Sequence, residues 1–296
     1  MRWIDNRALV VVTALLAAAT PAWAQQTIHT ERSLYRNIFV TENDGVRCMK
    51  FLRGQNAGRQ SCQSLQEPEH LVFNYTRMMM GALYLNPSPR RILIVGLGGG
   101  TLPSALNSVL PGADIDIVEV DAAVTRVAER FFGFRKGPKL RVHEEDGRVF
   151  VKRALKKGER YDLVMLDAFD HEYIPEHLLT REFLQEVKGL LGDGGVVAAN
   201  TFSGSRLYHH ESVTYEAVFG TFFNLESNNR VILTRLGGLP SRTDLARNAD
   251  MLDTRLMRLG VEKTWLLPLF STERTWQANA RILTDQYSPS NLLNAK

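Results

Sequence analysis

Short apolar runs recur along the chain from residue 91 onward, and stretches with helical spacing separate them. The first run, RILIV, is apolar at nearly every position, which is typical of a parallel strand buried on both faces. The runs occupy residues 91–95, 115–120, 140–143, 162–166 and 195–199. Helices are expected between them, at 122–132, 148–156 and 180–191. This alternation predicts a doubly wound, mostly parallel α/β sheet.

The two ends of the chain follow other patterns. At 223–226 and 230–234, two short runs flank a polar turn and predict antiparallel strands that close the sheet. An amphipathic helix is expected at 241–260. Before residue 70, a β-rich run at 35–41, an Asn-Asp-Gly turn and a return run at 46–52 predict a hairpin. We therefore expect a small antiparallel β-module over 25–69, followed by an α/β domain over 70–296.

Residues 70–85 have helical character and contain three consecutive methionines. Methionine fills irregular gaps in hydrophobic cores, so we expect these side chains to be core filler. A Met-rich ligand surface is the alternative.

The first 24 residues resemble a targeting segment. Arg2 and Arg7 precede an apolar run at 8–19, and Ala22-Trp23-Ala24 has the A-x-A pattern of a cleavage site. This pattern predicts a secretory signal peptide, 1–24, that is removed in the mature protein. A membrane anchor is the alternative, but the run falls short of the roughly 20 residues that a span needs. We expect an exported, periplasmic protein with no stable membrane span after cleavage.

Charge and composition exclude several classes of protein. The chain has 36 Lys and Arg against 32 Asp and Glu, a net charge of +4. Residues of both signs are scattered along the sequence. A nucleic-acid binder usually clusters its basic residues on one face, so no nucleic-acid partner is expected. With 44% hydrophobic residues, the chain is not intrinsically disordered.

Cys48 and Cys62 are the only cysteines, and they lie at matching distances from a turn at 54–58. In a hairpin they could face each other across two strands. An oxidising compartment favours a disulfide, which would stabilise the fold by roughly 3 kcal/mol in the chain-entropy model. Two unpaired buried thiols are the alternative to the disulfide. A zinc site is not expected, because two cysteines alone would lack the other ligands.

A glycine-rich turn, Gly96-Leu97-Gly98-Gly99-Gly100, follows the first buried strand and precedes a helix. Glycines let the backbone turn sharply and approach a ligand closely. Such a turn is weak evidence by itself, because many strand-to-helix turns are glycine-rich for packing, but its position after the first strand of a βαβ pattern strengthens the case for a ligand.

Acidic residues end the next three strands. Glu119 lies 23 positions beyond Gly96, where a carboxylate can accept hydrogen bonds from ribose hydroxyls, and Asp146, Asp167 and Asp170 follow the next two strands. Asp121 is expected to cap the following helix, and a cap is also the simpler interpretation of Asp146. Carboxyl ends of parallel strands meet at one edge of the sheet. An acidic edge repels phosphates and suits a cationic ligand, such as a polyamine, or a hydroxyl-rich nucleoside.

These segments together resemble the spermidine synthase family of aminopropyltransferases, from roughly residue 30 to the end. The resemblance implies a Rossmann-like methyltransferase fold. It rests on Phe73-Asn74-Tyr75, on PSPRRILIVGLGGG at 87–100, on VEVD at 118–121, on EDG at 145–147, on YDLVMLDAFD at 161–170 and on LTDQYSP at 283–289.

The resemblance implies a donor site and an acceptor site. Gln66 and Glu119 would bind decarboxylated S-adenosylmethionine, with Glu119 on the ribose, and Asp146 would contact the adenine. The donor site would be completed by Gly96, Gly98 and Gly147. Asp167 matches the residue that accepts the proton of the attacking amine, and Tyr75 and Asp170 match residues that position a polyamine such as putrescine.

Three positions depart from the family pattern. The glycine-rich loop of the family carries an Asp that binds the amine of the aminopropyl donor, and Gly99 occupies that position here. His171 replaces the Pro that usually follows Asp170, and Thr76 replaces a His or Gln. A glycine at position 99 does not repel the carboxylate of intact S-adenosylmethionine, so the donor could be either nucleoside.

We therefore expect an aminopropyltransferase. A methyltransferase that uses S-adenosylmethionine and a non-catalytic nucleoside- or polyamine-binding protein are the alternatives. No metal is expected, because the adjacent His209 and His210 point in different directions on a helix and no ligand spacing accompanies them. The resemblance also implies a homo-oligomer, a dimer or a tetramer.

Overall fold

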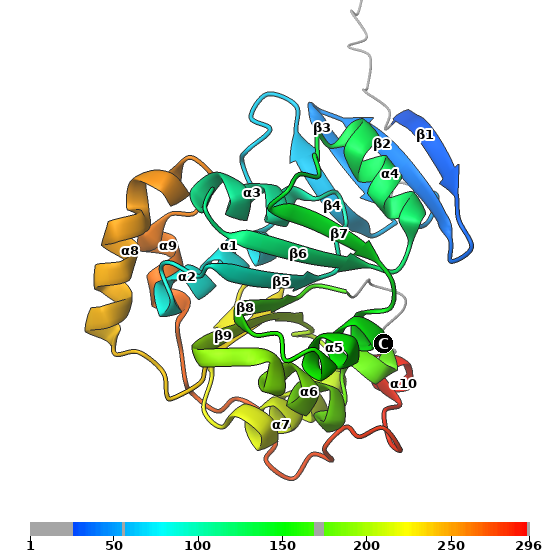
Figure 1. Ribbon diagram of the computed structural model, residues 1–296. Coiled ribbons are helices and arrows are strands. Elements are labelled where there is room, and N and C mark those ends of the chain that lie inside the picture. The colour runs from blue at the N-terminus through cyan, green and yellow to red at the C-terminus, as the bar shows by residue number, and fades with distance from the viewer. Residues whose placement is uncertain (1–25, 55–56, 169–174, 295–296) are drawn as a thin grey trace, which may run out of the picture.

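A computed structural model describes residues 26–54, 57–168 and 175–294 as two β-sheets with flanking helices (Figure 1). The larger sheet has seven strands in the order β10-β11-β9-β8-β5-β6-β7. Its strands are β5 (Arg91–Val95), β6 (Asp114–Glu119), β7 (Leu140–Glu144), β8 (Tyr161–Leu166), β9 (Leu191–Thr201), β10 (Phe223–Glu226) and β11 (Arg230–Arg235). Strands β5 to β9 are parallel, whereas β10 and β11 are antiparallel additions at one edge. The predicted doubly wound α/β fold is confirmed.

Helices cover both faces of this sheet (Figure 1). Ile92 and Ile94 of β5 face one cluster of buried side chains, and Leu93 and Val95 face the other. The first face is covered by α1 (Asn74–Met80), α2 (Ala82–Leu85), α3 (Thr101–Val109), α4 (Ala122–Phe131) and α8 (Arg242–Met257). The second is covered by α5 (Gly147–Lys156), α6 (Arg181–Leu190) and α7 (Leu207–Phe219). This alternation explains why β5 is apolar at successive positions.

The smaller sheet precedes the larger one in sequence and is an antiparallel meander. It contains β1 (Gln26–Arg32), β2 (Asn37–Asn43), β3 (Val46–Lys50) and β4 (Arg59–Ser64) in that order. Cys48 and Cys62 are register partners on β3 and β4, and their sulfur atoms form a disulfide. The sheet is joined to α4 by an ion pair between Glu31 and Arg126, at 2.9 Å.

The helical segment at 70–85 is divided at Gly81 into α1 and α2. A Cβ at Gly81 would lie 2.8 Å from the carbonyl oxygen of Met78, so the close backbone approach there favours glycine. Met78, Met79 and Met80 are fully buried, which confirms the interpretation as core filler.

The chain after α8 continues through α9 (Lys263–Leu266), the 3-10 turn η2 (Leu267–Leu269) and α10 (Ser290–Asn294). A 3-10 turn, η1 (Glu176–Leu178), lies between β8 and α6. Over the described ranges, no helix has the length and apolar character needed to span a membrane.

Candidate active site

A cavity of about 260 Å³ lies where the carboxyl ends of the parallel strands meet the smaller sheet. Its floor is formed by the turn after β5 and by the ends of β6 and β8, and η1 contributes to its wall. The smaller sheet contributes Tyr35, Arg36, Phe51, Gln60 and Ser61. Strand β5 lies between β6 and β8, where the strand order reverses, and ligands of open α/β sheets bind at such a point.

The glycine-rich turn brings the backbone of β5 against β8. Gly96 has a φ of +102°, and a Cβ there would lie 2.2 Å from the carbonyl oxygen of Asp167. Gly98 also has a positive φ, of +53°. Only glycine fits the first of these positions, so the turn places the cavity floor directly beside Asp167.

Glu119 ends β6 and lines the cavity. Its Oε2 accepts a hydrogen bond from the backbone N–H of Leu97 at 3.1 Å, and its Oε1 accepts one from Asp121 at 3.0 Å. Burial raises the pKa of Glu119, although both backbone hydrogen bonds act in the opposite direction. Two backbone hydrogen bonds therefore hold the carboxyl group of Glu119 beside the glycine-rich turn.

Asp121 caps α4, as expected, because its Oδ1 accepts from the backbone N–H of Ala123 at 2.9 Å. Its Oδ2 accepts from the hydroxyl of Ser33 at 2.6 Å. Ser33 belongs to the turn between β1 and β2, so this bond fixes that turn beside the cavity.

Asp146 both caps α5 and lines the cavity. Its Oδ1 accepts from the backbone N–H groups of Arg148 and Val149 at 2.9 and 3.0 Å, and its Oδ2 lies 2.8 Å from Nε2 of His177. Burial alone would raise the pKa of Asp146, but the hydrogen bonds from Val149 and His177 outweigh it and lower the pKa. Gly147 follows without a side chain because a Cβ there would lie 2.6 Å from Val95.

Asp167 directly follows β8 and lines the cavity floor. Its Oδ1 accepts from the side-chain amide of Asn200 at 3.0 Å, and its Oδ2 accepts from the hydroxyl of Tyr75 at 3.4 Å. Burial raises the pKa of Asp167 to about 7, against the effect of both hydrogen bonds. Burial and the neighbouring Asp167 in turn raise the pKa of Tyr75 well above its usual value. A carboxyl group with this pKa can exchange a proton near neutral pH.

The structure brings most of the predicted residues together and separates one from them. Glu119, Asp146, Gly147 and Asp167 line the cavity with Tyr75, as do Gly96 and Gly98. Gln66 is exposed in the turn after β4, and the cavity is instead lined by Gln60. The predicted Asp170 and the departure at His171 lie outside the described residues.

Three residues escaped the sequence analysis: Gln60 and His177, which line the cavity, and Asn200, which donates to Asp167. In the sequence, two adjacent polar residues, Gln60 and Ser61, directly precede Cys62. This pattern could have indicated that Gln60 lines a site. His177 and Asn200 are connected to Asp146 and Asp167 only through the fold, because each pair is more than 30 residues apart in sequence.

Gly99 has no room for a side chain. A Cβ there would lie 2.7 Å from the hydroxyl oxygen of Ser61 and 3.0 Å from the ring of Phe132. The position at which the family pattern has an Asp is thus closed by β4 and by the residue after α4. The cavity has no carboxylate at this point.

The adjacent histidines have separate partners. Nδ1 of His210 lies 2.6 Å from the carbonyl oxygen of Arg281, and Nδ1 of His209 lies 3.3 Å from the backbone nitrogen of Gln277. In the part of the chain that the structure describes, no three His, Cys, Asp or Glu side chains are grouped so that they could hold a metal ion.

Comparison with known proteins identifies similar sequences and folds. The spermine/spermidine synthase domain matches residues 72–234. A polyamine aminopropyltransferase of Vibrio vulnificus is 46% identical over 294 residues, covering 96% of this chain and 98% of the relative. The human eEF1A lysine and N-terminal methyltransferase is 32% identical over 153 residues, covering 47% of this chain and 22% of that protein. A crystal structure of a probable spermidine synthase from Corynebacterium glutamicum has a TM-score of 0.66 at 19% identity, covering 88% of this chain and 97% of that one.

Proposed function

The chain belongs to the spermine/spermidine synthase family, and we propose that it transfers an aminopropyl group from decarboxylated S-adenosylmethionine to a polyamine such as putrescine. One observation carries this proposal: Glu119, Asp146 and Asp167 come from three different strand ends and line a single cavity. Three carboxylates in one cavity attract a cation and accept hydrogen bonds.

The donor would lie across the glycine-rich turn. Glu119 is placed to accept hydrogen bonds from the ribose hydroxyls, and Asp146 to accept one from the adenine amine. Gln60, rather than Gln66, supplies the cavity with a side-chain amide from β4. The sulfonium would then lie toward Asp167, within the same cavity.

The reaction is an in-line displacement. A neutral amine attacks the carbon next to the sulfonium sulfur, the bond between that carbon and the sulfur breaks, and methylthioadenosine leaves. Amines are mostly protonated near pH 7, so a carboxylate must take the proton of the attacking nitrogen. Asp167 has the appropriate pKa, about 7, and Tyr75 donates to one of its oxygens.

Asn200 holds the proposed base in place. Its amide nitrogen donates to Asp167, while its Oδ1 is buried and has no hydrogen-bond partner among the described residues. Asn200 therefore orients the carboxyl group of Asp167 without itself lining the cavity. We propose that Asp170, as the family resemblance implies, helps to position the polyamine.

A second candidate function is supported by Gly99. Because the cavity has no carboxylate at this position, nothing there repels the carboxylate of intact S-adenosylmethionine. A methyltransferase that uses intact S-adenosylmethionine is therefore the alternative.

We also propose that the protein is exported to the periplasm and forms a homo-oligomer. The signal-like segment and the disulfide between Cys48 and Cys62 support export. Leu34, Leu52 and Leu65 are exposed on the turns of the smaller sheet and support self-association. Cell fractionation and size-exclusion chromatography with light scattering test these two proposals.

The activity is tested by incubating the purified protein, with its disulfide intact, with putrescine and decarboxylated S-adenosylmethionine. We expect spermidine and methylthioadenosine in equal amounts, and an Asp167→Asn variant that still binds donor but loses about 10²-fold or more of the turnover. A parallel reaction with intact S-adenosylmethionine tests the second candidate function, because methyl transfer would release S-adenosylhomocysteine. Binding of nucleoside without either product would identify a non-catalytic binding protein.

A further inference from the structure

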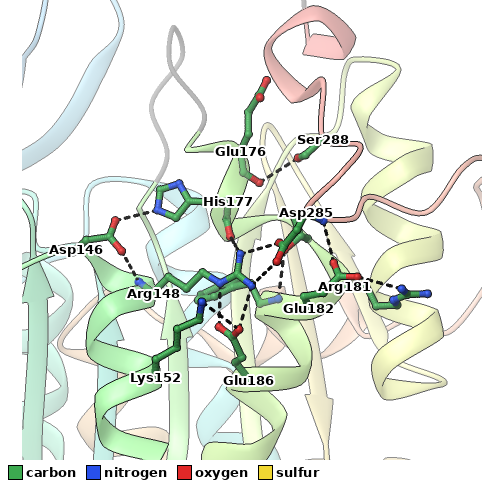
Figure 2. Close-up of polar contacts among 12 residues, drawn as sticks. Asp146, Arg148, Lys152, Glu176, His177, Arg181, Glu182, Glu186, Asp285 and Ser288 are labelled. Carbon is green, nitrogen blue, oxygen red and sulfur yellow. Dashed lines mark hydrogen bonds and ion pairs between the residues drawn. The ribbon is translucent and has the colours of Figure 1, made fainter.

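His177 lies in the cavity wall and contacts Asp146, the residue proposed to accept a hydrogen bond from the adenine amine (Figure 2). Its Nε2 is 2.8 Å from Oδ2 of Asp146, although 31 residues separate the two in sequence. Figure 2 shows the imidazole ring beside Asp146, at the start of α5. The two side chains come from different elements, η1 and the residue before α5, that meet at the cavity.

The hydrogen bonds of Asp146 divide between its two oxygens. Oδ1 accepts two backbone N–H groups of α5 and is fully used by the helix cap. Oδ2 has two lone pairs, of which His177 occupies one. The side chain of Asp146 is 34% exposed, so the remaining lone pair is open to a ligand. His177 thus directs the one oxygen of Asp146 that a base could reach.

The backbone of η1 is held from the side away from the cavity. The hydroxyl of Ser288 donates to the carbonyl oxygen of Glu176 at 3.0 Å, and the side-chain amide of Asn291 donates to Oε1 of Glu176 at 3.2 Å. Both residues belong to the chain segment before and within α10. These bonds fix the residue that directly precedes His177.

Arg148 fixes the same turn from within. Its guanidinium pairs with Glu186 of α6 at 2.9 Å and with Asp285 at 2.7 Å, and it donates to the carbonyl oxygen of His177 at 3.4 Å (Figure 2). Thr180 also donates to Asp285, at 2.7 Å. The imidazole of His177 is therefore presented to Asp146 by a rigid support, as a preorganised ligand contact requires.

We propose that His177 is a positioning residue for the base of the donor: it orients Oδ2 of Asp146 toward the adenine amine and so favours adenine over bases that lack this amine. The inference rests on the proposed function, in which Asp146 contacts the adenine. A site built to accept a hydrogen bond rejects a ligand that lacks the donor.

The alternative is that the contact is an ordinary surface ion pair. The side chain of His177 is 43% exposed, and exposed ion pairs contribute little to stability. Such a pair would affect every nucleoside equally when it is removed. Discrimination between bases is the measurement that separates the two roles.

The test compares methylthioadenosine with methylthioinosine, which has a carbonyl oxygen in place of the adenine amine. Binding of each is measured by calorimetry to the wild type, to His177→Ala and to His177→Gln. We expect His177→Ala to weaken methylthioadenosine about tenfold, the effect of losing roughly one hydrogen bond, and to change methylthioinosine less than about twofold. Gln places an amide nitrogen where Nε2 lies, so His177→Gln should restore the affinity to within about threefold.

His209→Ala is the matched control, because it makes the same replacement on α7, outside the residues that line the cavity. Thermal unfolding of each variant shows that it is folded. Equal losses for both nucleosides, or an unchanged affinity for methylthioadenosine, would overturn the role of His177 and leave the proposed function intact. If the wild type binds neither nucleoside, the proposed function and this inference both fail.

Discussion

Replacing Asp167 by Asn should stabilise the folded protein at alkaline pH while it removes the proposed proton acceptor. Burial raises the pKa of this carboxyl from 3.8 to about 7 on folding. The folded state therefore binds the proton more tightly than the unfolded state. The stability associated with this proton is fully present below pH 3.8 and is lost as the pH rises through about 7.

The size of the effect follows from the difference between the two pKa values. A shift of about 3 units corresponds to about 4 kcal/mol of destabilisation once the pH exceeds the folded pKa. Asp167 keeps some contact with the open cavity, so solvent screening makes this an upper limit. Asn has nearly the same shape and no charge, and its carbonyl oxygen can still accept from Asn200. The variant should therefore gain up to about 4 kcal/mol at pH 8 and almost nothing near pH 4.

Urea unfolding of the wild type and Asp167→Asn at several pH values measures this difference. Asp116→Asn is the matched control because Asp116 is also buried in the sheet, but its pKa changes in the opposite direction. Burial would raise the pKa of Asp116, yet hydrogen bonds from Arg141 and His143 lower it, so its stabilisation is present at neutral pH and is lost on acidification. Asp116→Asn should therefore destabilise the protein at pH 8. An Asp167→Asn variant that is no more stable than the wild type at pH 8 would refute the reasoning.

Three further substitutions test other parts of the structure. Replacing Cys48 and Cys62 by Ser should lower the free energy of unfolding by roughly 3 kcal/mol in urea, and equal stability of wild type and variant would argue against a structural disulfide. Gly99→Asp should destabilise by about 1–3 kcal/mol in thermal unfolding, because its Cβ has no room, whereas Gly112→Asp has no atom within 4 Å and should be tolerated. Arg148→Ala should lower the free energy of unfolding by about 2 kcal/mol in the same assay. This is less than for a fully buried ion pair, because the side chain of its partner Asp285 is 43% exposed. A loss below about 0.5 kcal/mol would show that the ion pairs of Arg148 do not stabilise the fold.

The larger sheet could be predicted because its central strands are apolar at successive positions, a pattern that a solvent-exposed element cannot have. The acidic edge could be predicted for the same reason, since strand ends that are located correctly also locate Glu119, Asp146 and Asp167. Strand β1 was not separately predicted because its side chains are mostly exposed or half-buried and give no apolar signal.

The bounds of helix α7 were not predicted, although His209 and His210 were placed on a helix, because this helix packs polar groups inward. Glu211, Ser212 and Thr214 are all buried, and Ser212 accepts from the buried Arg230 at 2.8 Å. Polar residues at buried positions remove the hydrophobic period by which a helix is recognised in sequence.

Which glutamine lines the cavity could not be predicted, because the segment after β4 has no regular structure and spacing along the sequence does not locate its side chains. The family resemblance implies a role for Gln66, which is exposed after β4, whereas Gln60 lies on β4 and lines the cavity. His177 could not be found from spacing either, because its contact with Asp146 depends on how η1 docks.

The segment that holds η1 is synthesised after every other part of the cavity wall. Arg181 donates its backbone N–H to the carbonyl oxygen of Leu283 at 2.8 Å, and Asp285 and Ser288 make the contacts with Arg148 and Glu176. A nascent chain can thus assemble the sheet and its carboxylates while the turn that carries His177 still lacks its support. The proposed nucleoside binding would then require the synthesis of residues 283–288 as well as the folding of the sheet, and a nascent chain without them would have an unsupported cavity wall.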